Sequence, residues 1–331
     1  MYTSNYGLLD LRIAISEYLK DRHGLTYSAD KQVLVTVGIS QALDLAMRAI
    51  LDPGDEVIIP EPTYVSYVPC VILAGGVPVT VPTHMDNSFH VRPSDIESHI
   101  TRKTKAILLG YPNNPTGAVM PRNDLEKIAR IAKSYDLTVI SDEIYERLVY
   151  GVDHTSFASL KDMADRTIHL GGFSKSYAMT GWRCGWILGP ESLISHGNSV
   201  QSHATSNVSS ITQKAALAAL TGGDSDVIAM CGEYKDRRDL LIDALKTEPR
   251  YRIVTPGGAF YLFPDITEFL SIDGLRTSAE FSTRLLQEAH VAVTPGEAFD
   301  APGYLRLSFA ASKTKLLEAS ERLLAFASKV N

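Results

Sequence analysis

Lys175 has the sequence setting in this chain that is best suited to covalent chemistry. It follows Ser174 directly and precedes Arg183 in the segment 171–183. A lysine amine forms a Schiff base with a carbonyl only after losing its proton, and burial or nearby positive charge lowers its pKa enough to allow this near neutral pH. The Ser174 hydroxyl and the Arg183 guanidinium could bind a phosphate beside it. Most lysines are solvated surface charges, so the interpretation depends on other residues.

A second candidate for phosphate binding lies between a strand-like apolar run at 32–37 and a helical pattern at 41–51. The start of a helix presents unpaired backbone N–H groups and the positive end of its dipole, which favour an anion. The alternative is an ordinary turn in which Ser40 caps the helix. Only the combination with the residues around Lys175 favours a phosphate. The residues concerned are Gly38, Ile39 and Ser40.

Two polar clusters follow apolar runs that are typical of buried strands. Asn114 comes after the run 106–109, and Asp142 and Tyr145 come after the run 137–140. Either cluster alone could be a turn or a helix cap. In a parallel sheet, however, both would lie at the carboxyl edge, where ligands bind. A carboxylate such as Asp142, held against a pyridine nitrogen, keeps that ring protonated and able to accept electron density, while Tyr145 and Asn114 could donate to a ring hydroxyl.

Two further residues could contact a ligand from other elements. Tyr64 follows the strand-like run 57–59 and offers an aromatic face for stacking on a flat ring. Arg306 lies in the alternating segment 305–309, where its side chain and the apolar ones point to opposite faces. A guanidinium on a strand suits a bidentate clamp on a carboxylate. Without the other candidates, Tyr64 would be assigned to the core and Arg306 equally well to a solvated face.

The elements that must position these residues follow two patterns. From residue 32 to about 190, short apolar runs alternate with helical patterns, which indicates βα units and a mostly parallel sheet covered on both faces. Further on, a charged helical pattern at 234–247 precedes short strand-like runs, and Ser312 caps a final helix. We expect an α/β fold in which residues 1–230 form a large domain and residues 231–331 form a smaller α+β domain.

Composition limits the classes of function. The chain has 331 residues, of which 45% are hydrophobic and 21% charged, as in a globular protein. Its net charge of −6 provides no basic field for nucleic acid. No apolar run approaches the ~20 residues that span a bilayer, and the N-terminus lacks the pattern of a signal peptide. The three cysteines have no CxxC spacing, so we expect neither disulfides nor a zinc site, and a cytoplasmic location.

Together the candidate residues form an ordered set that resembles the class I/II aminotransferases of the fold-type I pyridoxal-phosphate enzymes, from about Tyr2 to the C-terminus. The resemblance implies the aspartate aminotransferase fold, with a large domain that binds pyridoxal 5′-phosphate. It also implies an enzyme that moves an amino group between an α-amino acid and a 2-oxo acid by a ping-pong mechanism. The motifs that carry it are 37–42 (VGISQA), 114–117 (NPTG), 141–145 (SDEIY), 174–183 (SKSYAMTGWR), 257–261 (GGAFY) and 305–308 (LRLS).

The resemblance implies a role for each candidate. Lys175 would bind the cofactor covalently and carry the proton, Asp142 would contact the pyridine nitrogen, and Tyr145 would contact the ring hydroxyl. Arg306 and Asn114 would bind the substrate, and Asn114 would also contact the ring hydroxyl. Tyr2 would reach the phosphate of a neighbouring subunit, so the resemblance implies a homodimer. The remaining cofactor contacts would come from Gly38, Ile39, Ser40, Tyr64, Ser174 and Arg183.

Alternatives within this resemblance stay open. A pyridoxal-phosphate lyase or synthase of the same fold would keep the same anchor residues, and an inactive or sensor relative would bind the cofactor without turnover. Members usually carry a few dozen residues ahead of the Tyr2 position, including a glycine-bearing cover over the site, whereas this chain begins at Met1. The motifs are closest to the aspartate, aromatic and N-acetyl-diaminopimelate types. No second arginine can be assigned to a side-chain carboxylate, so the substrate is not identified.

Overall fold

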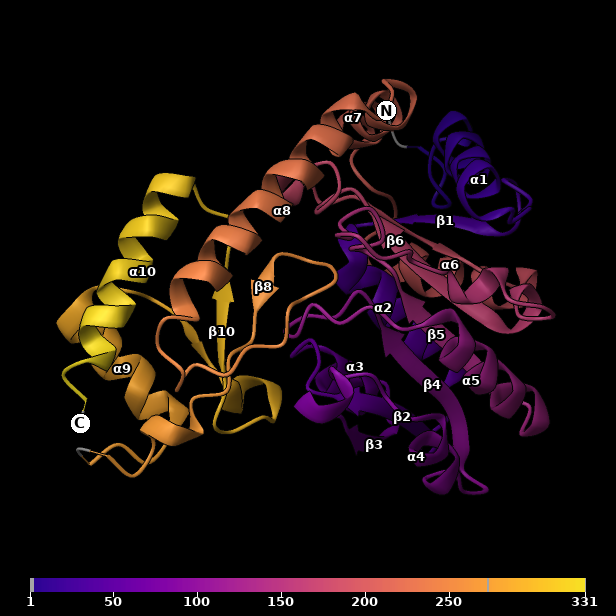
Figure 1. The fold of residues 1–331 in the computed structure, drawn as a ribbon. Coiled ribbons are helices and arrows are strands. Elements are labelled where there is room, and N and C mark those ends of the chain that lie inside the picture. Colours follow the sequence, from indigo (N-terminus) through magenta and orange to yellow (C-terminus); the bar gives the residue numbers. More distant parts are fainter. Residues whose placement is uncertain (1–2, 273, 331) are drawn as a thin grey trace.

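Two β-sheets organise the chain in the computed structural model, which describes residues 3–272 and 274–330 (Figure 1). Tyr2, expected to reach a neighbouring subunit, lies outside the described residues. The α-helices are α1 Leu9–His23, α2 Gly38–Ile50, α3 Tyr67–Leu73, α4 Pro93–Ser98, α5 Arg122–Ser134, α6 Glu191–Ala204, α7 Ser210–Thr221, α8 Ser225–Leu245, α9 Ser278–Ala289 and α10 Lys313–Ala327. The strands are β1 Val33–Thr36, β2 Glu56–Glu61, β3 Val77–Pro82, β4 Thr104–Gly110, β5 Thr138–Asp142, β6 Thr167–Gly172, β7 Gly185–Leu188, β8 Tyr261–Leu262, β9 Thr294–Pro295 and β10 Leu305–Ser308. Short 3₁₀ helices are η1 Met85–Asn87, η2 Phe157–Ser159, η3 Ala164–Arg166, η4 Thr180–Trp182, η5 Thr267–Phe269 and η6 Gly296–Phe299.

The large sheet has seven strands in the order β1-β7-β6-β5-β4-β2-β3. Strands β2 to β6 pair in parallel, and β7 runs antiparallel to both of its neighbours, β1 and β6. The sheet is therefore mostly parallel, as the alternating pattern predicted. Because the parallel strands end at the same edge, the loops after β2, β4, β5 and β6 lie close together.

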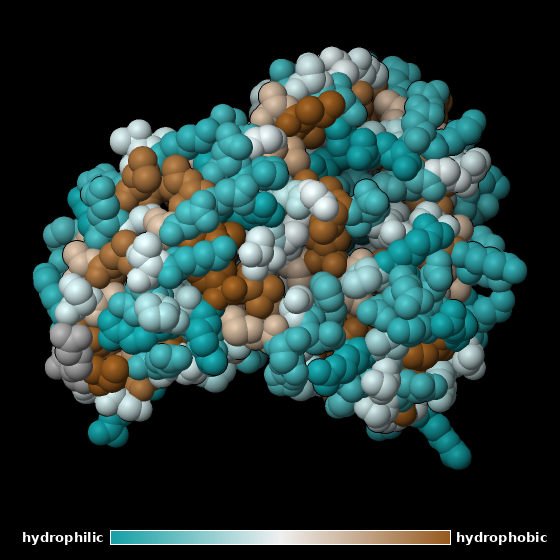
Figure 2. Space-filling view, in the orientation of Figure 1, coloured by the Kyte–Doolittle hydropathy of each residue, from teal (hydrophilic) through white to brown (hydrophobic). Residues whose placement is uncertain are grey.

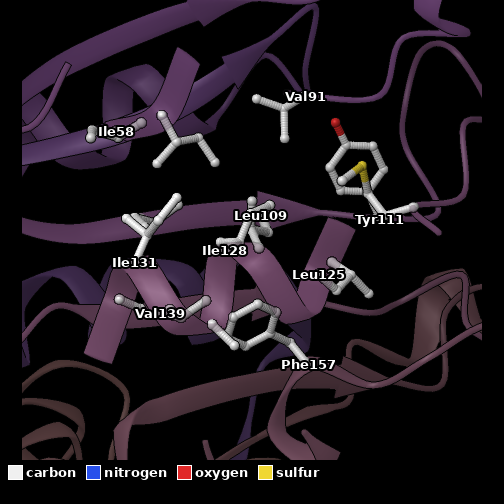
Figure 3. Close-up of a cluster of buried hydrophobic side chains, with 14 of the residues drawn as sticks. Ile58, Val91, Leu109, Tyr111, Leu125, Ile128, Ile131, Val139 and Phe157 are labelled. Carbon is white, nitrogen blue, oxygen red and sulfur yellow. The ribbon is translucent and has the colours of Figure 1, made fainter. Parts of the chain in front are cut away.

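Helices cover both faces of this sheet, and side-chain alternation along the strands divides the core between them. Ile107 and Leu109 of β4 pack with α5 on one face, the cluster drawn in Figure 3. Ala106 and Leu108 of the same strand point to the other face and pack with α2 and α6. Each central strand is thus buried on both sides, which explains the continuous apolar runs in the sequence.

The small sheet has the order β8-β10-β9 and is antiparallel. Its strands are shorter than the strand-like runs after residue 247 suggest, and Arg252 forms only an isolated bridge, with Asp265. β10 alternates as expected, with Leu305 and Leu307 buried and Arg306 half-buried on the other face. Ser312 caps α10 by accepting a hydrogen bond from the Lys315 N–H, which confirms that prediction.

Helix α8 connects the regions of the two sheets (Figure 1). It begins at Ser225, earlier than the pattern at 234–247 indicated, and it spans residue 230. The division of the chain at residue 230 stays a prediction. Hydrophilic residues dominate the face drawn in Figure 2, and hydrophobic residues gather in separate clusters, some along the junction of the two regions. In the described part of the chain, no helix has the length and apolar character needed to cross a membrane.

Candidate active site

A cavity of about 380 Å³ opens at the carboxyl edge of the large sheet. It receives side chains from the loops after β2, β4, β5 and β6, from the start of α2, and from β8 and β10 of the small sheet. Of the candidates named from the sequence, all that are described line this cavity except Gly38, which lies beside it. The lining residues are Ile39, Ser40, Tyr64, Tyr67, Gly110, Pro112, Asn114, Asp142, Ile144, Tyr145, Ser174, Lys175, Thr180, Arg183, Tyr261 and Arg306.

Lys175 follows β6 and enters the cavity between two aromatic rings. Its Nζ lies 5.6 Å from the centre of the Tyr145 ring and 5.4 Å from that of Phe260. Burial lowers the pKa of Lys175, and the positive charges of Arg306 and Arg183 lower it further, against the opposing effect of Asp142. The amine therefore meets the condition set for Schiff-base chemistry, namely a weakened hold on its proton.

Asp142 is the last residue of β5 and is 4% exposed. Its Oδ2 accepts a hydrogen bond of 2.8 Å from the Tyr67 hydroxyl, and its Oδ1 accepts one of 3.2 Å from the Ile144 N–H. Burial raises the pKa of Asp142 to about 6, although both hydrogen bonds act in the opposite direction. The ionised form of this buried carboxylate is therefore strongly stabilised by a cationic partner placed in the cavity.

The start of α2 forms one side of the cavity, and its geometry suits an anion. Gly38 is the first helical residue, with φ of +71°, and no side chain caps the helix. Ser40 is therefore inside the first turn and is not the N-cap, so the simple capping alternative does not hold. A Cβ at Gly38 would lie 2.7 Å from Arg183 Nη2, so the glycine leaves room for the guanidinium beside the free N–H groups. Arg183 also donates to the Thr180 carbonyl at 2.9 Å.

Arg306 reaches the cavity from β10 of the small sheet. Its guanidinium carbon lies 4.6 Å from the centre of the Tyr261 ring and 4.8 Å from that of Phe299, so the group is held between two aromatic faces. Nη1 donates to Asn114 Oδ1 at 2.9 Å, and Nη2 donates to Thr294 Oγ1 at 3.3 Å. The contact with Asn114 joins the two sheets across the cavity.

Four tyrosines, Tyr64, Tyr67, Tyr145 and Tyr261, line the cavity together with Asp142. The Tyr145 and Tyr261 hydroxyls lie 3.1 Å apart, and burial raises the pKa of Tyr145 well above its usual range, which keeps the phenol protonated as a donor. Tyr64 meets Tyr67 edge to face, with ring centres 5.7 Å apart. Ser174 lines the cavity next to Lys175.

Sequence reasoning missed Tyr67 and Tyr261 as cavity residues. Tyr67 opens α3, and its hydroxyl fits because Gly110 has no side chain: a Cβ there would lie 2.3 Å from that oxygen. The glycine at the end of β4 was the available signal, since a strand-end glycine often marks close approach. Tyr261 lies in the motif at 257–261, but only the fold brings it to Tyr145.

The chain is similar to aminotransferases along nearly its whole length. It matches the family described as aminotransferase class I and II over residues 1–323. The putative aminotransferase YugH of Bacillus subtilis (strain 168) is 44% identical over 330 residues, which are 99% of this chain and 84% of that protein. The aromatic aminotransferase structure from Pyrococcus horikoshii OT3 has a TM-score of 0.95 at 42% identity, covering 99% of this chain and 88% of that one. The aspartate aminotransferase structure from Thermotoga maritima has a TM-score of 0.93 at 40% identity, covering 99% and 84%.

Proposed function

The chain belongs to the class I and II aminotransferases, and from this premise we propose that the cavity at the carboxyl edge is its active site, centred on Lys175 and Asp142. The protein is a pyridoxal-phosphate-dependent transaminase with the fold of aspartate aminotransferases, and it acts on an amino acid and a 2-oxo acid. The lyase, synthase and sensor alternatives are not favoured, because the relatives named above are aminotransferases.

The chemistry of the donor set fits pyridoxal phosphate. The free N–H groups of Gly38, Ile39 and Ser40, with Ser174 and Arg183, suit its phosphate. The missing side chain at Gly38 keeps that corner open. Asp142 suits the pyridine nitrogen, Asn114 and Tyr145 suit the ring hydroxyl, and Tyr64 offers a ring for stacking. Lys175 would supply the amine that holds the cofactor at its aldehyde carbon.

The residues then divide the reaction among them. When bound, the cofactor supplies an electron sink for the negative charge that develops at the substrate α-carbon. Arg306 binds the substrate carboxylate and is itself held by Asn114. Lys175 Nζ takes the α-proton and later returns it, for which a lowered pKa is needed. Asp142 keeps a negative charge against the ring nitrogen throughout, and each half of the ping-pong cycle uses the same groups.

The observation that carries this proposal is that Lys175, Asp142 and Arg306 meet in one cavity from three separate elements. We expect Lys175→Ala to abolish turnover, a loss of at least ~10³-fold on general acid–base grounds, while phosphate contacts retain part of the cofactor affinity. Turnover and cofactor binding are measured separately. Lys214→Ala, which alters an exposed lysine on α7, is the control and should behave as wild type. Unchanged turnover in Lys175→Ala would refute the assignment.

The donor is best sought among aspartate and the aromatic amino acids, because two related structures are described as acting on these. A panel of amino acids is incubated with 2-oxoglutarate, and the 2-oxo acid products are identified. Pyruvate and ammonia formed without any acceptor would contradict transamination and support a lyase.

We further propose that the protein is a cytoplasmic homodimer. The three cysteines Cys70, Cys184 and Cys231 are all free, which fits a reducing compartment. In the homodimer, Tyr2 would contact the phosphate bound to the partner subunit. Sedimentation at micromolar concentration tests the dimer, and a monomer with full activity would contradict it.

A further inference from the structure

Behind Asp142 lies a buried cluster of carboxylates and imidazoles that the proposed reaction does not use. It occupies the side of the turn after β5 that faces away from the cavity. The next residue, Glu143, is 1% exposed and points into this cluster, while Asp142 faces the cavity. The cluster consists of Glu143, Glu146, His154 and His169, with His23 and Tyr18 from α1.

Glu143 fixes the turn that carries Asp142. Its Oε1 accepts hydrogen bonds from Ser141 Oγ at 2.7 Å, Ser156 Oγ at 3.1 Å and the Phe157 N–H at 3.0 Å. These bonds stabilise the ionised form, and neighbouring imidazoles hold the pKa of Glu143 well below its usual range. The turn is therefore ordered at the cost of a buried negative charge one residue away from Asp142.

Two imidazoles lie where they can balance that charge: His154, whose Nε2 is 2.8 Å from Glu143 Oε2, and His169. His169 is fully buried in β6, where its neighbours Ile168 and Leu170 point to the α2 face and it points to the other. Its Nε2 is 3.5 Å from Glu143 Oε2, an ion-pair distance, and neither ring nitrogen has a good hydrogen bond to any described residue. An apolar side chain would avoid the ~1–3 kcal/mol penalty of unsatisfied buried polar atoms, so the imidazole needs an electrostatic reason.

We propose that His169 is a positioning residue whose imidazolium balances Glu143, so that Asp142 can stay ionised toward the cavity. The inference rests on the proposed role of Asp142 at the ring nitrogen. Burial alone would lower the pKa of His169, but the charges of Glu143, Glu146 and Asp142 raise it overall. Other titratable groups face the same region: His154, His23, Tyr18 and Tyr27 lie around the cluster, and Tyr67, Tyr145 and Lys175 lie around Asp142.

His23 offers a matched control within the same cluster. Its Nε2 lies 2.5 Å from Glu146 Oε2, on the α1 side of the turn, whereas His169 is paired with Glu143. His169 and Glu143 are among the groups that shift the pKa of Asp142, whereas the contact of His23 is with Glu146. His169→Gln and His23→Gln make the same chemical change. Only His169→Gln, however, removes the positive charge that β6 places beside Glu143.

The test uses the pH dependence of pyridoxal-phosphate binding to the apoenzyme, together with the absorbance of the bound cofactor. The midpoint is the pH at which cofactor affinity is halfway between its low-pH and high-pH values. We expect His169→Gln to raise this midpoint by roughly one pH unit, and His23→Gln to leave it unchanged. The double variant Glu143→Gln/His169→Gln should return toward wild type, because the unbalanced charge is gone. Urea unfolding of every variant shows which ones remain folded. If His169→Gln alone is unstable, the double variant is compared with Glu143→Gln alone, and the double variant should then have the higher midpoint because it lacks the His169 charge.

Two results would overturn the inference. One is the same midpoint in His169→Gln and His23→Gln. The other is the presence of one bound metal ion per chain that is lost in both histidine variants. His23, Glu143 and Glu146 have ligand atoms within 4.8 Å of one another, so such an ion would make the imidazoles metal ligands. Asp142→Asn distinguishes a failure of the proposed function from a failure of the role given to His169. Full turnover in that variant would refute the proposed function itself. Loss of turnover in Asp142→Asn, with equal midpoints in the two histidine variants, would refute only the role of His169.

Discussion

Asp142 is required for the proposed reaction, yet its buried charge lowers the stability of the ligand-free protein. Its pKa is raised to about 6, chiefly by burial, from an ordinary value near 4. Between these values the folded protein binds more protons than the unfolded chain, so the unfolding free energy falls as pH rises through the window from about 4 to 6. Two pK units correspond to at most about 3 kcal/mol. The ligand-free enzyme bears this cost at neutral pH.

Asp142→Asn should therefore separate activity from stability. We expect the ligand-free variant to be more stable than wild type above about pH 6, by up to ~3 kcal/mol, with the difference disappearing toward about pH 4. Turnover should fall by several orders of magnitude, because the amide cannot hold a proton on the ring nitrogen. Urea unfolding of the apoenzyme at both pH values measures the first effect. A variant that is less stable than wild type at about pH 8 would contradict this account.

Tyr67 controls the same carboxylate by donating to Asp142 Oδ2. Hydrogen bonds to charged groups contribute ~1.5–3 kcal/mol, so Tyr67→Phe should lower kcat/KM by about 10- to 100-fold at neutral pH and move the acidic limb of the pH profile upward. Tyr27→Phe is a matched control, because the Tyr27 hydroxyl is also buried but has no hydrogen-bond partner among the described residues. Equal effects of the two changes would rule out a specific role for Tyr67.

At the scale of elements, the first turn of α2 depends on backbone shape. Gly38 and Gly54 both have positive φ, of +71° and +92°, so alanine at either position is strained by ~1–2 kcal/mol. Only at Gly38 would the Cβ meet Arg183; at Gly54 nothing lies within 4 Å. We expect Gly38→Ala to weaken binding of inorganic phosphate and of the cofactor by at least ~10-fold, and Gly54→Ala to change stability alone. Titration calorimetry of the apoenzyme distinguishes the two.

At the scale of the whole molecule, the cavity combines side chains from both sheets, and the proposed homodimer adds Tyr2 from a partner. Lys175→Ala and Tyr2→Ala protomers, each of low activity, should complement one another when refolded together. Half of the randomly formed dimers are then mixed, and each contains one complete site, so about a quarter of wild-type activity should return. Mixing without any gain in activity would argue against a shared site.

The apolar runs are enough to predict the parallel sheet, because strands buried on both faces must be apolar throughout, and that signal is local. The sequence also indicated Lys175, Asp142 and Asn114, since strand-end positions in such a sheet meet at one edge, and Arg306, since alternation along 305–309 separates it from the apolar side chains. The weaker predictions concerned the short strands of the small sheet. β8 and β9 are two residues long each, and so short a pairing leaves no periodic pattern.

Which polar groups meet across the chain could not be predicted from local patterns, because it depends on how distant segments pack. The hydroxyl of Tyr67 reaches Asp142 because Gly110 leaves space, and His169 faces Glu143 because β6 lies beside β5 in a fixed register. Arg306 reaches Asn114 only because the small sheet lies over the edge of the large one. Local patterns record how each segment folds, whereas the protonation of Asp142 and Lys175 depends on burial and on charges from distant segments, which exist only in the assembled fold.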